Sequence, residues 1–358
     1  MTANSKIDPN AMNRRDQIVS QIILLVITAS VLFPILYVIG LSFNPDPRRP
    51  TSLVIWPAQP TLDNYKQVLD HPTANPVSFA QLALNSFGLS SGVAAVSILF
   101  AVFAAYAFSR FQFKGRSEVM IFIFVLRLIP GVATLLPMFL LLNRVTTSST
   151  VLGFIIGVAA AIILFAVVSW FVGRLRDNEV GTGAIGTLLL GLIIGGAIAY
   201  GAYDSINKGE EFILRNSLYG VGIAMVSGGL PFAVWNLKGY LDTIPKELEE
   251  AARIDGASFN QTFFRVVLPL AAPVLAVTFF LNFMGNWAEF YVSWQFLTDP
   301  SNYTLSMTLW NIVGQYAANI PWNIFAAYAV VMALPVAIIY LVFQRQIVGG
   351  LTLGGVKG

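Results

Sequence analysis

Cysteine is absent from the 358 residues, and histidine occurs once, at His71. The lack of cysteine excludes disulfides, thiolate catalysis and cysteine-bound metals, and one histidine cannot form a multi-histidine metal site. The sequence also contains no G-x-x-x-x-G-K-[ST] phosphate loop, so we do not expect the chain to hydrolyse ATP by itself. No group of residues indicates a catalytic centre. We therefore expect no catalytic residues, no metal site and no cofactor.

Charge is scarce as well. Charged residues make up 11% of the chain and apolar residues 56%, whereas a soluble globular domain carries about 25% charged residues. This deficit indicates that lipid is the solvent for much of the surface. The formal net charge is only +3, and no basic stripe suited to nucleic acid is present. The sequence predicts an all-α polytopic membrane protein that does not bind nucleic acid.

Long apolar runs occupy most of the chain. A membrane-spanning helix needs about 20 predominantly apolar residues. A polar cytoplasmic tail, 1–18, precedes the first run, which we expect to be a retained membrane helix rather than a removed signal peptide. Eight spans are expected, at 19–43, 83–108, 119–142, 151–172, 183–203, 217–237, 268–291 and 324–347.

The second and sixth spans are rich in serine and glycine, respectively. Small and hydroxyl-bearing residues allow membrane helices to pack closely. They also suit the lining of a pathway, and the sequence leaves both interpretations open.

Lysine and arginine indicate how the chain is oriented. They are more frequent in the segments that face the cytoplasm if the N-terminus lies inside, which is the usual bias. Both termini are therefore expected to be cytoplasmic, with 44–82 and 292–323 as outer loops. The tryptophans and tyrosines of 292–323 either anchor the chain at the membrane interface or contact an external partner or sugar ring.

A polar patch, KELEEAARIDGASFNQTFFRVVLP, lies on the inner side between the sixth and seventh spans. Pro245 suits the first turn of a helix, and Gly256 suits its end. Ser258 and Gln261 fit a capping box that begins a second helix, which Pro269 should kink or restart. The small alanine face of the first helix favours docking of another protein, although an ordinary amphipathic surface helix has the same pattern.

The stretch EAARIDGASFNQTFFRVVLP resembles the EAA signature of ABC importer permeases, with valine at 266 in place of isoleucine. Other stretches, among them AAYAFSRFQFKG, VWNLKGYLDTIPKELEEAA and the terminal GLTLGGVKG, resemble the maltose-type carbohydrate branch of that family, and in particular the shorter of its two permeases. The positions that match the signature are Glu250, Ala251, Ala252, Gly256, Val266, Leu268 and Pro269.

The resemblance implies a type I importer fold with six core helices and an inner coupling helix that docks on a separate ATPase. Glu250 would contact the ATPase electrostatically, Ala251 and Ala252 would permit close approach, and Gly256 would set the turn. The implied partners are a second homologous permease, a homodimer of cytoplasmic ATPase subunits, and an extracytoplasmic protein that binds a di- or oligosaccharide such as maltose or trehalose. The expected coupling residues are Glu250, Ala251, Ala252, Asp255, Gly256, Ala257, Leu268 and Pro269.

The chain departs from the family in having two additional spans. We expect 144–215 to be an inserted transmembrane hairpin that serves peripheral packing or lipid contact, or else binds a regulatory partner. It divides the core helices into 19–143 and 216–348, with the coupling loop at 238–267 and a cytoplasmic tail at 349–358.

Two charged residues are expected within or beside membrane spans. Arg127 lies well inside the third span, where a charge should face protein or water, and Glu289 lies near the outer end of the seventh span beside Asn286. These three residues are candidates for lining or gating a translocation path, with a structural contact between helices as the alternative.

An ATP-driven sugar permease is the function that this sequence favours. Alternatives are a permease for another solute delivered by a binding protein, an ion-coupled secondary transporter, and a scaffold that transports nothing. A secondary transporter needs acidic or histidine relays at mid-membrane and often inverted repeats. The sequence offers one arginine, a peripheral glutamate and no clear repeat.

Overall fold

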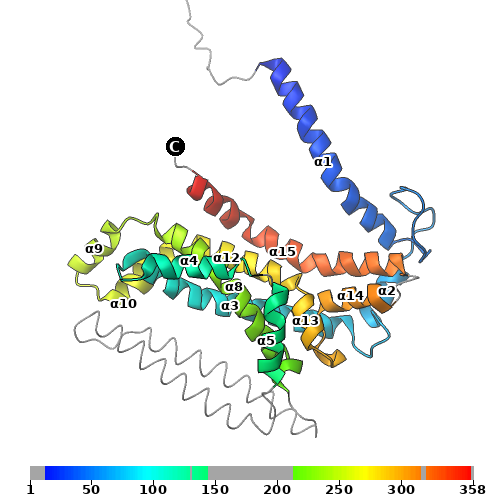
Figure 1. Cartoon of the computed structure of the whole chain (residues 1–358). Coiled ribbons are helices and arrows are strands. Elements are labelled where there is room, and N and C mark those ends of the chain that lie inside the picture. Colours follow the sequence, from blue (N-terminus) through cyan, green and yellow to red (C-terminus); the bar gives the residue numbers. More distant parts are fainter. Residues whose placement is uncertain (1–12, 130, 144–212, 316–319, 356–358) are drawn as a thin grey trace, which may run out of the picture.

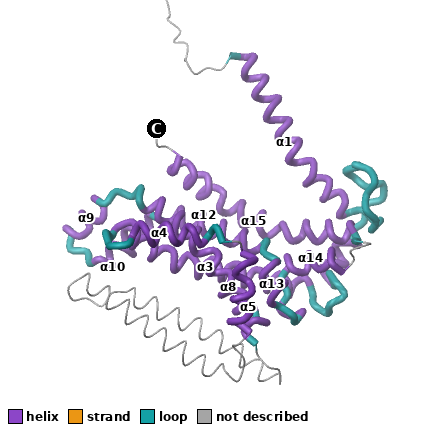
Figure 2. Tube along the Cα trace, in the orientation of Figure 1, coloured by secondary structure: helices purple, strands orange, loops and turns teal. Residues whose placement is uncertain are grey.

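The computed structural model describes residues 13–129, 131–143, 213–315 and 320–355. Within these ranges the regular elements are helices joined by loops (Figures 1 and 2). They are α1 (Arg14–Ser42), α2 (Asp63–Asp70), α3 (Phe79–Arg110), α4 (Arg116–Leu126), α5 (Gly131–Asn143), α8 (Leu218–Leu241), α9 (Glu247–Ile254), α10 (Phe259–Thr262), the π-helical turn η2 (Phe263–Val267), α11 (Leu268–Leu270), α12 (Ala272–Trp287), α13 (Tyr291–Phe296), α14 (Leu305–Gln315) and α15 (Trp322–Gly355), with short 3-10 turns η1 (Leu214–Asn216) and η3 (Pro300–Asn302).

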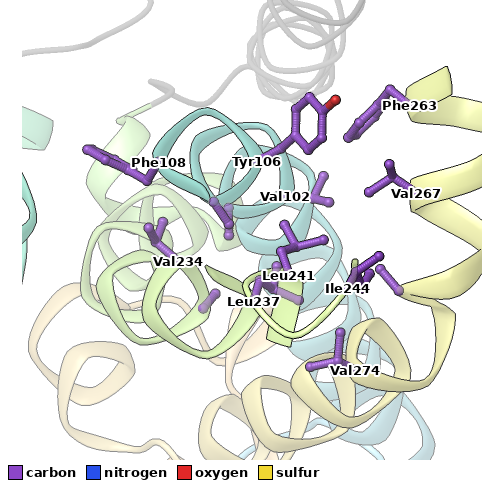
Figure 3. Packing of buried hydrophobic residues seen from close by; sticks show 14 of the residues in the cluster. Val102, Tyr106, Phe108, Val234, Leu237, Leu241, Ile244, Phe263, Val267 and Val274 are labelled. Atoms are coloured by element: carbon purple, nitrogen blue, oxygen red, sulfur yellow. The ribbon is translucent and has the colours of Figure 1, made fainter. Parts of the chain in front are cut away.

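The core of the bundle is formed by α3, α8, α12 and α15. Helix α3 packs along α8 and α12, and α12 packs in turn on α15. Figure 3 shows part of this core, where Val102 of α3 lies near Leu241 of α8, and Val267 and Val274 belong to the same cluster. Helices α9 and α10 lie at one end of the bundle, whereas α2, α13 and α14 lie at the other (Figure 1).

Four described helices are long and apolar enough to cross a membrane, or five if the bent helix pair is counted as one span. The four correspond to the spans expected at 19–43, 83–108, 217–237 and 324–347. The expected spans 151–172 and 183–203, and with them the hairpin 144–215, lie outside the described residues.

The third span is not the single helix that we expected at 119–142. It consists of α4 and α5, and between them the amides of Arg127, Leu128 and Ile129 bond to carbonyls three residues earlier. The sequence explains the break, since position 130 is proline. Proline has no N–H to continue a helix, and it disfavours the helical conformation of the residue before it.

The seventh span is bent rather than straight. Phe259–Leu270 and Ala272–Trp287 meet at an angle of 67°, so the kink predicted at Pro269 is present two residues further on, at Ala271. Pro269 and Pro273 each lie in the first turn of the helix that they begin. The span also ends at Trp287, short of the expected residue 291.

Both outer segments that we expected to be loops contain helices. Helix α2 lies within 44–82, η3 and α14 lie within 292–323, and α13 begins one residue before the second of these segments. Buried side-chain amides hold helix α2 in place. Asn64 of α2 donates to the carbonyls of Ser42 (2.9 Å) and Asn44 (2.8 Å), and it accepts a hydrogen bond from Asn323 (2.9 Å).

Helix α1 projects away from the rest of the bundle and contacts it mainly through α15 (Figure 1). Its apolar window is 0% buried, which is compatible with a helix whose backbone hydrogen bonds are satisfied internally and whose side chains face lipid or another chain. Near its outer end, Gly40 lies against the backbone of Ile55 so closely that a Cβ there would fall 1.5 Å from the Ile55 carbonyl oxygen.

We expect Gly40→Ala to lower the free energy of unfolding by roughly 1–3 kcal/mol, because the outer segment must move to admit the methyl group. Thermal unfolding in detergent measures the effect. The matched control is Gly88→Ala in α3, where an added Cβ meets nothing within 4 Å, and helix propensity alone should make that variant neutral or slightly more stable. Equal stability of the two variants would contradict the expected overcrowding.

Candidate functional site

The candidate site is the segment formed by α9, α10 and the turn between them, at the end of the bundle opposite α2, α13 and α14. Helix α9 begins with three acidic residues in its first turn, where the helix dipole favours negative charge. It ends as predicted at Gly256, whose φ of +85° lies in the left-handed region. The Gly256 amide donates to the Arg253 carbonyl (3.0 Å) and the Ala257 amide to the Ala252 carbonyl (2.9 Å), which together form a Schellman motif.

The second helix starts with the predicted capping box. The Ser258 amide donates to the side-chain oxygen of Gln261 (2.8 Å), and the Gln261 amide donates to the Ser258 hydroxyl (3.4 Å). Pro245, in contrast, precedes the helix, since α9 begins at Glu247 and Lys246 is its N-cap. Propensity statistics locate such boundaries only to within one or two residues.

The outward face of α9 combines an apolar tip with small and acidic side chains. Ile254 is 87% exposed and Leu248 is 44% exposed, and Glu250, Ala251 and Asp255 are exposed beside them. A helix that leaves an isoleucine almost fully exposed offers an apolar contact that nothing in the described part of this chain covers. We call this surface, formed by Leu248, Glu250, Ala251, Ile254 and Asp255, the docking face.

The predicted coupling residues divide into two groups. Glu250, Ala251, Ala252, Asp255, Gly256 and Ala257 come together in α9 and the turn that follows it, with Ala252 and Ala257 half-buried. Leu268 and Pro269 lie in α11, beside the bend of the seventh span. The two groups therefore belong to different parts of the structure, one to a surface and the other to a bend.

The inward face of α9 carries a residue that we did not predict as functional. Glu249 is buried, accepts a hydrogen bond from the Tyr106 hydroxyl (2.9 Å), and forms an ion pair with Arg110 Nε (2.5 Å). In the sequence, Glu249 is one of several first-turn acids, and Arg110 contributes only to the count of inner charges. The available signal was the helical period, which directs Glu249 away from Ala251 and Ile254.

The ion pair is part of a larger polar network at the ends of α3 and α8. Arg110 also donates to the Ile244 carbonyl (3.0 Å) and to the Ser109 hydroxyl (3.0 Å), which in turn donates to Asp242 (2.6 Å). Burial raises the pKa of Asp242, but hydrogen bonds from Lys238 and Ser109 lower it by more, so its pKa lies below the ordinary value. Asp242 is therefore ionised at neutral pH.

Aromatic side chains hold the second helix of the site against α3. The Tyr106 ring lies 4.8 Å from that of Phe263 and 5.6 Å from that of Phe259, and Phe103 stacks on Phe263 at 5.5 Å. Figure 3 shows Tyr106 beside Phe263 at the edge of the apolar cluster. The inner end of α3 thus contacts α9 through polar groups and α10 and η2 through aromatic rings.

The candidate pathway residues lie apart from this site. Arg127 is exposed at the break between α4 and α5 and donates to the Gly228 carbonyl of α8 (2.8 Å). Glu289 instead accepts from the Val292 amide (2.6 Å) at the start of α13. Among the described residues no ion pair joins Arg127 to Glu289, whereas the buried Asn286 side-chain nitrogen has no hydrogen-bond partner there.

Comparison with known proteins identifies the family. Residues 97–349 match the model of the binding-protein-dependent transport system inner membrane component. The chain belongs to this family of permeases. The matched range contains the whole candidate site and the four core helices, except for the first part of α3 and the last residues of α15.

The relatives of this permease confirm its resemblance to the maltose-type branch. It is 30% identical over 339 residues to the galactooligosaccharides transport system permease protein GanQ of Bacillus subtilis, with 95% of each chain covered. It is 29% identical over 349 residues to the maltose/maltodextrin transport system permease protein MalG of Escherichia coli K12, again with 95% of each chain covered.

A solved structure agrees at the level of the fold. The permease is similar to a chain in the crystal structure of a bacterial ABC transporter involved in the import of the acidic polysaccharide alginate, with a TM-score of 0.56 and 21% identity. The likeness covers 94% of this permease and 98% of that chain. The importer-permease fold expected from the sequence is therefore supported.

We expect Gly256→Ala to loosen the end of α9, since a left-handed conformation costs a non-glycine residue about 1–2 kcal/mol. Amide hydrogen exchange at Ala257, whose N–H closes the Schellman motif, should rise about tenfold. Gly256→Asn should have a smaller effect, because asparagine tolerates this conformation. The control is Gly239→Ala in α8, where the added Cβ meets nothing within 4 Å. Unchanged exchange in Gly256→Ala would contradict the expected strain.

Proposed function

We propose that this permease is one of the two membrane-spanning subunits of an ATP-driven importer for a di- or oligosaccharide of the maltose or trehalose kind. It works by alternating access, together with a second homologous permease, two cytoplasmic ATPase subunits and an extracytoplasmic sugar-binding protein. Family membership supports the transport role, and the names of the relatives, which include maltodextrin and galactooligosaccharide permeases, support the sugar class. A second solved structure contains a chain similar in fold to this permease, in complex with an alginate pentasaccharide-bound periplasmic protein.

The proposed topology has six core spans plus the inserted hairpin 144–215, with both termini in the cytoplasm. The excess of lysine and arginine on the inner segments supports this orientation. It assigns α9 and α10 to the cytoplasmic end of the bundle, and α2, α13 and α14 to the outer end. The ATPase and the binding protein then meet opposite ends of one bundle.

The docking face is the observation that carries the coupling role. An exposed isoleucine flanked by an alanine allows another protein to approach the helix backbone closely, and the neighbouring Glu250 and Asp255 can pair with basic residues of that protein. We infer that α9 inserts this face into a cleft of the ATPase subunit. Nucleotide-driven movement of that cleft then moves the membrane helices.

Arg127, Asn286 and Glu289 are proposed to line or gate the translocation path. A buried amide nitrogen without a partner, as in Asn286, is uncommon in proteins and is often explained by water or a ligand. Arg127 carries a charge at membrane depth, and such a charge should face protein or water. Its bond to a backbone carbonyl leaves most of its guanidinium donors for other contacts.

The alternative is a permease for a different solute delivered by a binding protein. The names of its relatives already span more than one sugar, so the substrate is best identified from the binding protein that works with this permease. Calorimetry with that protein measures its ligand directly.

ATPase activity of the whole assembly in vesicles, stimulated by the loaded binding protein, excludes a scaffold that transports nothing. Loss of uptake on collapse of the proton gradient at constant ATP would instead favour an ion-coupled transporter.

We expect Ile254→Asp to weaken binding of the ATPase subunit, because a carboxylate would be desolvated where an apolar side chain should dock. The stimulated ATPase rate should fall by about tenfold or more, which corresponds to at least ~1.4 kcal/mol. The stability of the permease alone should not change, since Ile254 is 87% exposed.

Co-purification of the ATPase with the permease is the measurement for this prediction. Leu53→Asp makes the same kind of change at an outer residue that is 74% exposed, and it should retain the ATPase. If Ile254→Asp retained the ATPase and its stimulation equally well, α9 would not be the docking element.

We expect Arg127→Met and Glu289→Gln each to lower sugar uptake by about tenfold, or ~1.4 kcal/mol of activation free energy. Radiolabelled sugar uptake at matched expression measures this. Glu289→Gln keeps an oxygen that can accept from Val292 but replaces the oxygen that accepts from Ser293 with an amide nitrogen, so thermal stability of the variant is measured beside its uptake. Normal uptake by both variants would leave these residues with a structural role only.

A further inference from the structure

A polar pocket of about 210 Å³ lies where α1 ends, beside the loop that leads to α2 (Figure 1). The last two turns of α1 line it with Tyr37, Gly40 and Leu41, and the loop lines it mainly with Asp46 and residues 48–52. This end of α1 is near α2, whereas α9 lies at the other end of the bundle. The pocket is therefore separate from the docking face.

Hydrogen bonds fix the loop that forms this pocket. The Tyr37 hydroxyl donates to the Ser52 carbonyl (3.1 Å), and the Trp322 amide at the start of α15 donates to the Pro47 carbonyl (2.9 Å). The loop backbone also packs closely on Gly40, as described above. The pocket is therefore bounded by a loop that two helices hold in place.

Two adjacent arginines determine the charge of the pocket. Arg48 forms an ion pair with Asp46 (2.8 Å) that uses its Nε and Nη2 and leaves Nη1 for another acceptor. The hydrogen bonds from Arg48 also keep the pKa of Asp46 below its ordinary value, so both groups are ionised at neutral pH and their charges cancel. Arg49 forms no hydrogen bond or ion pair within the described residues. The pocket therefore has one uncompensated positive charge.

The donors of the pocket suit a phosphate group. An arginine guanidinium is a planar fork that matches two phosphate oxygens at once. Thr51 and Ser52 line the same pocket, and their hydroxyl groups can each donate to a further oxygen. A phosphate offers more acceptor atoms than a carboxylate, and it can therefore use more of these donors. An anion that contains a phosphate group is the best match to Arg49 and its neighbours.

The surface of α1 just before the pocket is apolar and is left uncovered by the described part of the chain. Its side chains Leu32, Ile35, Leu36 and Val38 are between 37% and 51% exposed. Tyr37 lies between this surface and the pocket, and tyrosine is enriched where membrane helices reach the interface with water. A ligand that contacts both regions must have a charged head and an apolar tail, which is the chemistry of a phospholipid.

We propose that this pocket binds the headgroup phosphate of an anionic phospholipid whose acyl chains lie along α1. Arg49 is the main ligand of the phosphate, and Arg48 contributes through Nη1. A zwitterionic lipid binds less well, because its headgroup cation would lie beside an unpaired arginine. The inference goes beyond the transport role, and it requires only that α1 lies in the membrane, not which of its ends is inside.

Photo-crosslinking in the complete assembly tests this site. The probes are phosphatidylglycerol and phosphatidylcholine that carry the same photoreactive group in an acyl chain, and peptide mass spectrometry locates the attached lipid. We expect phosphatidylglycerol to label residues 32–41 more than phosphatidylcholine does. Arg49→Gln should lower that labelling about tenfold, as expected for a lost charge-assisted hydrogen bond. Arg49→Lys should recover part of it, because lysine keeps the charge but lacks the planar fork.

The matched control is Lys66→Gln, which removes an exposed positive charge from nearby α2, outside the pocket, and should leave the labelling unchanged. Arg49 is exposed and unpaired, so its variants should assemble. Equal labelling of Arg49→Gln and Lys66→Gln, equal labelling by the two lipids, or no attachment to residues 32–41 would overturn the site. An excess of inorganic phosphate should not displace the lipid. If it did, a free anion and not a phospholipid would be the ligand, and the proposal would fail.

Discussion

The buried contact between Arg110 and Glu249 is the interaction on which the inner side of this permease depends. Neither charge is tolerable alone in a site with so little water, so the pair determines which side of α9 faces the bundle. Successive residues of a helix point about 100° apart. With Glu249 held inward, Ala251 and Ile254 must therefore point outward. The docking face is exposed because the opposite face of the same short helix is tied to α3.

Lipid imposes a second constraint, which explains where the membrane helices are interrupted. Irregular backbone at membrane depth persists only where it is covered by protein or lines a water-filled cavity. The break at Arg127 occurs in a part of the chain whose side chains are exposed among the described residues, so at membrane depth its cover comes from outside those residues or from an aqueous path. The bend at Ala271 differs, because Val267 and Ala271 are buried against α3 and α8 within this chain. One interruption is thus uncovered within the described residues, whereas the other is part of their packed core.

Local signals in the sequence were sufficient for the features that depend on neighbouring residues. The left-handed turn at Gly256 and the capping box at Ser258 are formed by residues a few positions apart, and both are present as predicted. The ion pair between Arg110 and Glu249 joins residues 139 positions apart, and no local pattern specifies which of several acids meets which of several bases. Length and hydropathy predicted the four uninterrupted spans for the same local reason. They failed for the third span because the proline at position 130 weighs little in a hydropathy average although it ends a helix.

The spacing of the EAA signature has a physical explanation in this arrangement. Glu249 and Glu250 are adjacent in sequence, yet the helix directs one into the bundle and the other to the surface, so the acid of the signature is the exposed one. The signature then continues past Gly256 to Leu268 and Pro269, which lie beside the 67° bend rather than on the docking face. An insertion within α10, ahead of Phe263, would rotate everything after it by about 100° and carry Phe263 away from Tyr106. The fixed length of this stretch therefore keeps the docking helix, its aromatic support and the bend in register on α3.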